Sequence, residues 1–154
     1  MSRALVPILL AAIAWSSYWF WGAQNNLENI HRGLESPASG SNKIKYGVVN
    51  QVGFPNRYDV TVNNLSIENP IGKKIVRLPF IQVLRLIYNS KHKIIIFPIS
   101  LSIYDFNIKW ENAKASIVKD TLEDRLILEA QNLTVSEEKR LSFKAEKLQI
   151  SILY

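Results

Sequence analysis

The pattern of apolar and polar positions divides the chain into a helical N-terminal segment and a β-rich remainder. From Ala4 to Leu27 the sequence holds no charged residue, and the stretch from Ala4 to Trp21 is mostly aliphatic or aromatic. As a helix, this stretch rises about 27 Å, close to the roughly 30 Å thickness of the hydrocarbon core of a bilayer. We therefore expect this segment to cross a membrane once.

The two ends of this segment differ. Three of the four tryptophans lie at its C-terminal end, and Trp favours the headgroup level of a membrane. Arg3 precedes the apolar run, whereas the first charge after it belongs to Glu28. This bias predicts a single-pass protein of the inner membrane, with its N-terminus in the cytoplasm and its C-terminal domain in the periplasm. The residues expected to anchor it are Leu5, Ile8, Leu9, Trp15, Trp19 and Trp21.

A cleaved signal peptide is the main alternative to a retained anchor. Ala12-Ile13-Ala14 has the small-x-small pattern of a cleavage site. Cleavage there would leave the aromatic residues 15–21 exposed to water, which is costly. A retained anchor is therefore favoured, and a buried core helix fits the one-sided aromatic pattern less well.

Between the anchor and residue 43, the pattern is that of an amphipathic helix and a linker. Leu27, Ile30, His31 and Leu34 recur at the spacing of one helix face. The small and helix-breaking residues 36–41 follow as a linker. The sequence thus predicts an anchor over residues 1–22, a juxtamembrane helix and linker over 23–42, and a β-domain over 43–154.

After the linker, apolar residues alternate with polar ones, as in strands with one buried face. Tyr58, Val60 and Val62 show this alternation most clearly. Residues 74–97 fit either a helix or strands, and their β-branched and aromatic content favours strands. We expect roughly nine to eleven short antiparallel strands in a mainly β fold, as a meander sheet that is curved or half-barrel-like.

A unit with two apolar residues after a polar pair occurs three times, at residues 63–68, 131–136 and 146–151. It is expected where one face of a meandering sheet is apolar and the other wet, although any meander generates look-alikes. Either origin predicts a continuous apolar face. The residues expected to line an apolar groove on it are Tyr58, Val60, Val62, Leu133, Val135, Leu148 and Ile150.

Charge and composition exclude several classes of function. The formal net charge is +6 and the pI near 9.6, but Lys and Arg are scattered, so we expect no nucleic-acid partner. The chain has no cysteine, which excludes disulfides, thiolate metal sites and thiol catalysis. Arg57 and Asp59 share a strand face, and we expect a structural ion pair rather than a catalytic one.

The remaining polar residues form no catalytic pattern. His31 and His92 are the only histidines, which is little material for a metal site or a catalytic triad. The adjacent acids at residues 123–124 and 137–138 would point to opposite faces of a strand or into solvent. We therefore expect no enzyme activity, no metal and no cofactor.

Three segments carry the motifs of a known family. Residues 53–62 (GFPNRYDVTV) resemble the "GFP-x-R-x-D-hydrophobic-T" signature of a proteobacterial family named domain of unknown function 2125. Residues 79–94 resemble its second signature, P-F-x-Q-V followed by L-x-Y and H-x-I, and residues 126–133 resemble a third, strand-like motif. The family-motif residues are Gly53, Phe54, Pro55, Arg57, Tyr58, Asp59, Pro79, Phe80, Gln82, Tyr88 and His92.

The resemblance implies an inner-membrane protein with a periplasmic β-domain. The chain departs from the family pattern at Ser90-Lys91, where members usually have Pro-Asn. Members are also usually longer, so this chain would correspond to the first half of their architecture. A looser similarity to AsmA-like lipid-transport proteins is a fold-level analogy based on an anchor followed by amphipathic strands.

These observations favour a binding module whose apolar sheet face accepts a lipid or acyl chain, with Lys73, Lys74 and Lys91 near the headgroups. The alternative is a non-catalytic scaffold whose apolar face docks on another envelope protein. The expected partners are the lipid bilayer and either a lipid ligand or an envelope protein. A lipid module should co-purify with lipid, and a scaffold with a stoichiometric protein.

Overall fold

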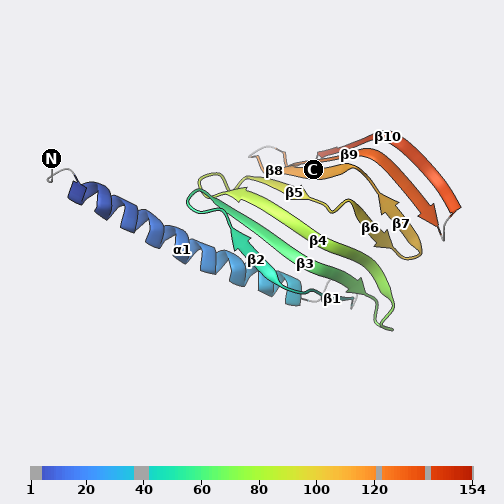
Figure 1. Cartoon of the computed structure of the whole chain (residues 1–154), viewed down its shortest axis with the longest axis horizontal. Helices are drawn as coiled ribbons and strands as arrows, with labels where there is room; N and C mark the ends of the chain where they lie inside the picture. Colours follow the sequence, from blue (N-terminus) through green and yellow to red (C-terminus); the bar gives the residue numbers. More distant parts are fainter. Residues whose placement is uncertain (1–4, 37–41, 121–122, 138–139, 154) are drawn as a thin grey trace.

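In a computed structural model, the chain forms one long helix followed by one antiparallel sheet (Figure 1). The structure describes residues 5–36, 42–120, 123–137 and 140–153. In these ranges the sheet has ten strands, which confirms the mainly β fold with an N-terminal helix. The helix is α1 (Leu5–Glu35), and the strands are β1 (Lys43–Lys45), β2 (Val49–Val52), β3 (Arg57–Glu68), β4 (Lys74–Leu86), β5 (His92–Ile96), β6 (Ser100–Ile103), β7 (Phe106–Lys109), β8 (Asn112–Val118), β9 (Arg125–Glu137) and β10 (Arg140–Leu153).

Helix α1 is continuous through Gly22, so the apolar stretch and the predicted juxtamembrane helix are one element. It is long and apolar enough to cross a membrane, as a membrane anchor or a signal sequence would be. The stripe of Leu27, Ile30, His31 and Leu34 is half-buried. Residues 37–41 of the predicted linker, as well as Arg3, lie outside the described residues.

The strands from β3 to β10 form an up-and-down meander if β5 with β6, and β7 with β8, are each taken as one interrupted strand. β5 and β6 lie end to end along β4, and β7 and β8 lie end to end along β9. The turn between β6 and β7 makes these four strands one interrupted hairpin, because β5 pairs with β8 and β6 with β7. β10 pairs with β9, while β1 and β2 both pair with β3. Residues 74–97, which fitted a helix or strands, contain β4 and β5.

Two of the long strands contain an asparagine in the left-handed region. Asn64 of β3 has a φ of 51° and Asn132 of β9 a φ of 50°, a conformation that Asn adopts more readily than most other residues with a side chain. Each is the second residue of a recurring unit found in the sequence, at 63–68 and 131–136. The third unit, at 146–151, has no positive φ and lies in β10, where Lys147 pairs with Gln131, the first residue of the second unit.

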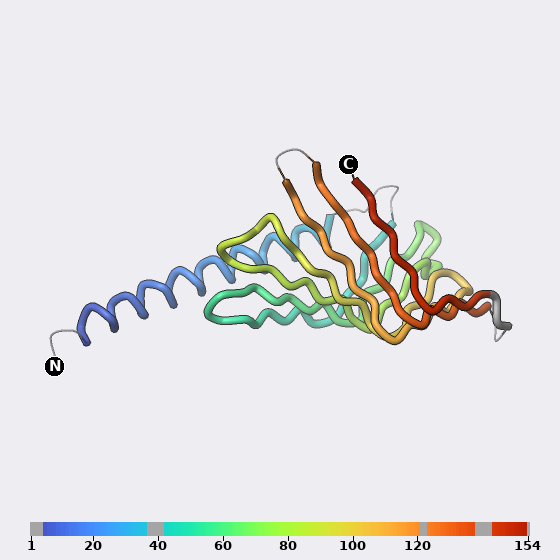
Figure 2. The backbone as a smooth tube through the Cα atoms, turned by 90° about the horizontal axis from the view of Figure 1, so that it is seen from above, coloured from blue at the N-terminus to red at the C-terminus, as the bar shows by residue number. Residues whose placement is uncertain are grey.

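These asparagines lie on one line across the sheet with other breaks in regular geometry. Pro79 of β4 stands opposite Asn64, between the pairs Asn63–Phe80 and Leu65–Leu78. Residues 97–99 separate β5 from β6, and residues 110–111 separate β7 from β8 at the level of Asn132. Figure 2 shows β9 and β10 changing direction part-way along their length. The line therefore divides the sheet into a near half, which holds Tyr58 and the β2–β3 turn, and a distal half.

The apolar positions change face at this line. In β4, Ile81 pairs with Val62 in the near half, and Leu78 pairs with Leu65 in the distal half. Ile81 and Leu78 are three residues apart in an uninterrupted strand, and side chains alternate between faces at every residue. The near half is thus apolar on one face, which we call the helix face because Tyr58 on it contacts α1, and the distal half is apolar on the opposite face.

This switch divides the residues expected in one groove. Leu148 and Ile150 pair with Ala130 and Leu128, on the helix face with Tyr58, Val60 and Val62. Leu133 and Val135 pair with Ala145 and Phe143 of β10, whose odd-numbered positions face the other way from Leu148 and Ile150. The register therefore places Leu133 and Val135 on one face of the sheet and the other five residues of the expected groove on the opposite face.

We expect the bend to depend on the left-handed backbone of Asn64. Asn64→Val should be less stable than Asn64→Gly by about 1–2 kcal/mol, because a β-branched side chain is strained at positive φ and Gly is not. Denaturant unfolding of the full chain in mild detergent measures the difference. Asn132→Val and Asn132→Gly should show the same difference in stability. Equal stability of the Val and Gly variants would contradict a left-handed backbone at these asparagines.

Candidate functional site

The first family motif forms a tight turn between β2 and β3. Gly53 has a φ of 112°, and a Cβ atom there would lie 2.8 Å from the carbonyl oxygen of Arg57. The amide of Arg57 donates a 2.8 Å hydrogen bond to the carbonyl of Gly53, and the Phe54–Pro55 peptide is cis. Only glycine fits this position without strain, which explains the first residue of the motif.

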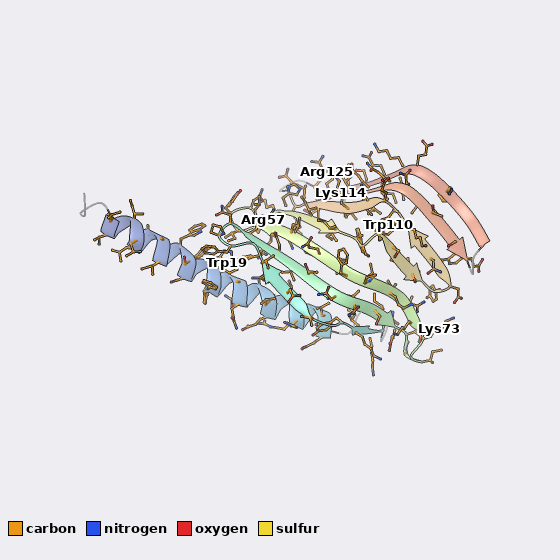
Figure 3. The ribbon with its side chains drawn as sticks, viewed as in Figure 1. Trp19, Arg57, Lys73, Trp110, Lys114 and Arg125 are labelled. Carbon is orange, nitrogen blue, oxygen red and sulfur yellow. The ribbon has the colours of Figure 1, made fainter. Side chains whose placement is uncertain are left out.

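The aromatic end of α1 docks on this turn. The indole N–H of Trp15 donates to the carbonyl of Pro55 at 3.1 Å, and that of Trp19 donates to the carbonyl of Arg57 at 3.1 Å. The ring of Phe54 meets that of Trp19 edge-on at 5.4 Å and stacks on that of Phe20 at 6.2 Å. The turn and the helix are thus joined by directed hydrogen bonds as well as by apolar contact (Figure 3).

Tyr58 holds the centre of this helix–sheet junction. Its ring lies 5.7 Å from that of Trp19, and its hydroxyl donates to the carbonyl of Trp19 at 3.4 Å. A Cβ atom at Gly22 would lie 2.0 Å from the Tyr58 hydroxyl oxygen, so a side chain at residue 22 would push the helix off the sheet. Tyr58 is 5% exposed, and burial raises the pKa of its hydroxyl, which therefore stays protonated at neutral pH.

A layer of polar contacts continues the junction towards the end of α1. Asn26 donates to Gln51 at 2.8 Å and accepts from Arg85 at 2.9 Å. The guanidinium of Arg85 lies 5.3 Å from the ring centroid of Tyr58, in cation–π geometry. One helix residue thus ties together β2 and β4. Further along, His31 hydrogen-bonds to Tyr46 at 3.2 Å.

Arg57 and Asp59 form the ion pair that the sequence predicted, with a nitrogen–oxygen distance of 2.7 Å. They lie on the face opposite Tyr58. Asp59 is 4% exposed and the side chain of Arg57 is 52% exposed, so the pair is covered on one side only. It flanks the turn at Gly53.

The second family motif is spread along β4 and β5 rather than gathered at the junction. Gln82 donates to the hydroxyl of Thr61 at 3.2 Å on the neighbouring strand. His92, the first residue of β5, hydrogen-bonds to Ser116 at 3.0 Å. Tyr88 is exposed in the turn between β4 and β5. Pro79 and Phe80 lie at the bend described above.

The helix face of the near half is a continuous apolar surface. Cross-strand pairs connect one aliphatic residue from each of six strands, in the order Val60, Val83, Ile95, Ala115, Leu128 and Ile150. Val60 is 2% exposed at the β3 end of this row and Ala115 is 4% exposed within it, whereas Ile150 at the β10 end is 41% exposed. Ile152, on the same face of β10, is 45% exposed. Figure 1 shows α1 along the β2–β3 side, with β9 and β10 far from it.

The three lysines expected near lipid headgroups, Lys73, Lys74 and Lys91, do not lie at one place in the structure. Lys91 lies in the turn between β4 and β5, at the end of the sheet that α1 contacts through Trp19. Lys74 begins β4, at the other end of this strand, and lines a distal cleft of about 470 Å³ with Arg77. Figure 3 shows Lys73 at the opposite end of the sheet from Trp19.

Among the described residues, no three His, Asp or Glu side chains come together as they would around a metal ion. Sequence reasoning missed Gly22, Asn26 and Arg85 as parts of the junction. Gly22, directly after the aromatic run at residues 18–21, was the available signal for a close approach. The partners of Asn26 and Arg85 depend on register and tertiary contact, which no local pattern reveals.

Comparison with known proteins gives one match. The sequence model of the family described as "uncharacterized protein conserved in bacteria (DUF2125)" matches residues 19–153. No curated protein and no solved structure matches the chain. The matched range begins at Trp19, so it includes Trp19 and the rest of α1 after it, but not Trp15.

We expect the junction to tolerate no side chain at residue 22. Gly22→Ala should lower the free energy of unfolding by about 1–3 kcal/mol through overpacking against Tyr58. The matched control is Gly33→Ala in the same helix, where a Cβ atom meets nothing within 4 Å, and which should stabilise by up to about 1 kcal/mol through helix propensity. Thermal or denaturant unfolding followed by Trp fluorescence measures both.

Removing the Tyr58 hydroxyl should relieve the clash with a Cβ atom at residue 22. Tyr58→Phe combined with Gly22→Ala should be less destabilised than the sum of the two single changes, because contacting residues are not additive. Additive losses would show that residue 22 acts on stability in some other way.

Proposed function

The chain belongs to the bacterial family DUF2125, and on that premise we propose that it is a non-enzymatic, membrane-anchored β-domain that holds the acyl chain of a lipid on its helix face. In this proposal α1 crosses the inner membrane with its N-terminus in the cytoplasm, and the sheet lies in the periplasm. The single observation that carries lipid binding is the apolar row from Val60 to Ile150, which α1 covers at one end only.

A retained anchor is supported by the contacts of the aromatic residues. Cleavage after Ala14 would separate the apolar half of α1 from Trp15 and Trp19, which are both hydrogen-bonded to the turn of the sheet. Trp19 is 6% exposed, so it belongs to the core of the junction. The apolar residues before Trp15 are largely exposed, and a bilayer would cover them.

An acyl chain is a suitable occupant of the helix face because the row is aliphatic. The row begins beside Tyr58 and Trp19, next to the aromatic end of the apolar helix, so a lipid tail leaving the bilayer would meet it close to the membrane. Burying the exposed parts of Ile150 and Ile152 would contribute about 25 cal/mol for each Å² of apolar surface removed from water.

A protein partner is the second candidate, and one observation favours it. β10 is 14 residues long and, in the part of the chain that the structure describes, pairs with β9 alone. A strand edge with unpaired N–H and C=O groups is suited to strand addition by another chain. In this alternative the domain is a scaffold on which an envelope protein docks.

The topology can be tested with a reporter that is active only outside the cytoplasm. Fused after Tyr154, it should be active because Arg3 stays on the cytoplasmic side. The intact mass of the extracted protein should include the apolar half of α1. An inactive reporter would reverse the proposed orientation, and a mature N-terminus at Trp15 would refute the retained anchor.

Photo-crosslinking in cells tests the ligand. A photoreactive residue at position 150 should give lipid adducts several-fold more often than one at 149, because Ile150 lies on the helix face and Gln149, its exposed neighbour, faces the other way. Adducts from position 150 to one protein would favour the scaffold instead. Equal yields at both positions would contradict a specific occupant of the helix face.

A further inference from the structure

A pocket of about 390 Å³ lies between α1 and the ends of β4 and β5. The helix contributes the side chains of Tyr18, Asn26 and Asn29, and the sheet contributes Arg85 and Lys93. Its walls therefore present amide and hydroxyl groups as well as two cations. Gly22 on the helix wall keeps this part of α1 close to the sheet.

The two cations are placed against each other. Arg85 of β4 and Lys93 of β5 are directly opposite in the register, and both are half-buried. Like charges directly opposite each other on neighbouring strands are destabilising. The guanidinium of Arg85 contacts the Tyr58 ring and donates a hydrogen bond to the Asn26 amide oxygen. Neither of these groups is an anion.

No acid balances these charges in the described part of the chain. No Asp or Glu lines the pocket, and neither Arg85 nor Lys93 takes part in an ion pair there. Elsewhere in the sheet, Lys45, Arg57 and Lys114 each pair with a carboxylate. The pocket therefore has the charge complementary to an anion that is not part of this chain.

The position of the pocket indicates where this anion comes from. Tyr18 and Gly22 belong to the end of the apolar stretch of α1, next to Trp19 and Trp21. In the proposed topology this is the headgroup level of the outer leaflet, where lipid phosphates lie. Arg and Lys bind phosphate through charge-assisted hydrogen bonds, and the Asn and Tyr side chains add donors for the remaining oxygens.

We propose that this pocket binds the phosphate of an anionic membrane lipid, with Lys93 and Arg85 as its cationic ligands. The proposal rests on the membrane anchoring proposed above. It assigns the headgroup to the pocket and leaves the acyl chain to the helix face, whose row runs from Val60 beside Tyr58. The bound phosphate separates and neutralises two cations that otherwise repel.

The test uses the full chain in nanodiscs of phosphatidylcholine that contain phosphatidylglycerol. After release into mild detergent, native mass spectrometry should show phosphatidylglycerol retained on the wild-type protein in preference to phosphatidylcholine. Lys93→Gln should reduce this retention roughly tenfold, the loss expected for one charge-assisted hydrogen bond. Lys93→Arg, which keeps the charge, should restore it.

The matched control is Lys147→Gln, which removes the same charge from an exposed position of β10 that faces away from the helix face. It should leave retention unchanged. Equal losses in Lys93→Gln and Lys147→Gln would show attraction to net charge alone and overturn the site. An unfolding curve for each variant shows whether the loss of bound lipid reflects a change in the pocket or unfolding of the protein.

Inorganic phosphate distinguishes the source of the anion. Excess free phosphate should not displace the lipid from the wild-type protein if the pocket is built for a headgroup, and displacement would overturn the assignment to a lipid in favour of a soluble phosphate. Lipid adducts at position 150 that persist in Lys93→Gln would overturn the headgroup pocket while the acyl-binding function stands.

Discussion

The contact of the Tyr58 hydroxyl with the backbone of α1 at Gly22 sets the distance between helix and sheet. Because a single Cβ atom would not fit there, the helix lies close enough for Trp15 and Trp19 to reach the carbonyls of the β2–β3 turn. The same distance lets Asn26 reach both Gln51 and Arg85. If the helix moved outward, these hydrogen bonds would lengthen together, and polar groups such as Gln51 would remain without partners at a partly buried interface.

The second constraint is the line of breaks through Asn64 and Asn132. A flat sheet of this width would have one apolar face exposed along its whole length, which is unfavourable in water. Here the alternation changes at the bend, so neither face is apolar from end to end. The helix then needs to cover apolar surface in the near half only, and the open remainder lies on the β8–β10 side.

The sequence was most informative where one periodicity dominates. The alternation of Tyr58, Val60 and Val62 predicted β3 and its buried side chains, and the uncharged stretch before Leu27 predicted the apolar helix. The recurring units were visible as well, but their meaning was not, because nothing local tells an asparagine in the left-handed region from one that simply points to solvent. The expected groove therefore joined Leu133 to Leu148, although Leu133 lies beyond the bend. Arg85 and Lys93 look like scattered basic residues until the register of β4 and β5 places them together.

Continuity of α1 has a mechanical consequence. The helix has 31 residues, which corresponds to about 46 Å, and no break separates its apolar half from the half that is bonded to the sheet. With the apolar half in a bilayer as proposed, the sheet has no independent hinge at the membrane surface and moves with the helix as a rigid lever. Helix tilt follows bilayer thickness, so a thinner or thicker membrane would turn the open β8–β10 side towards or away from the lipid surface.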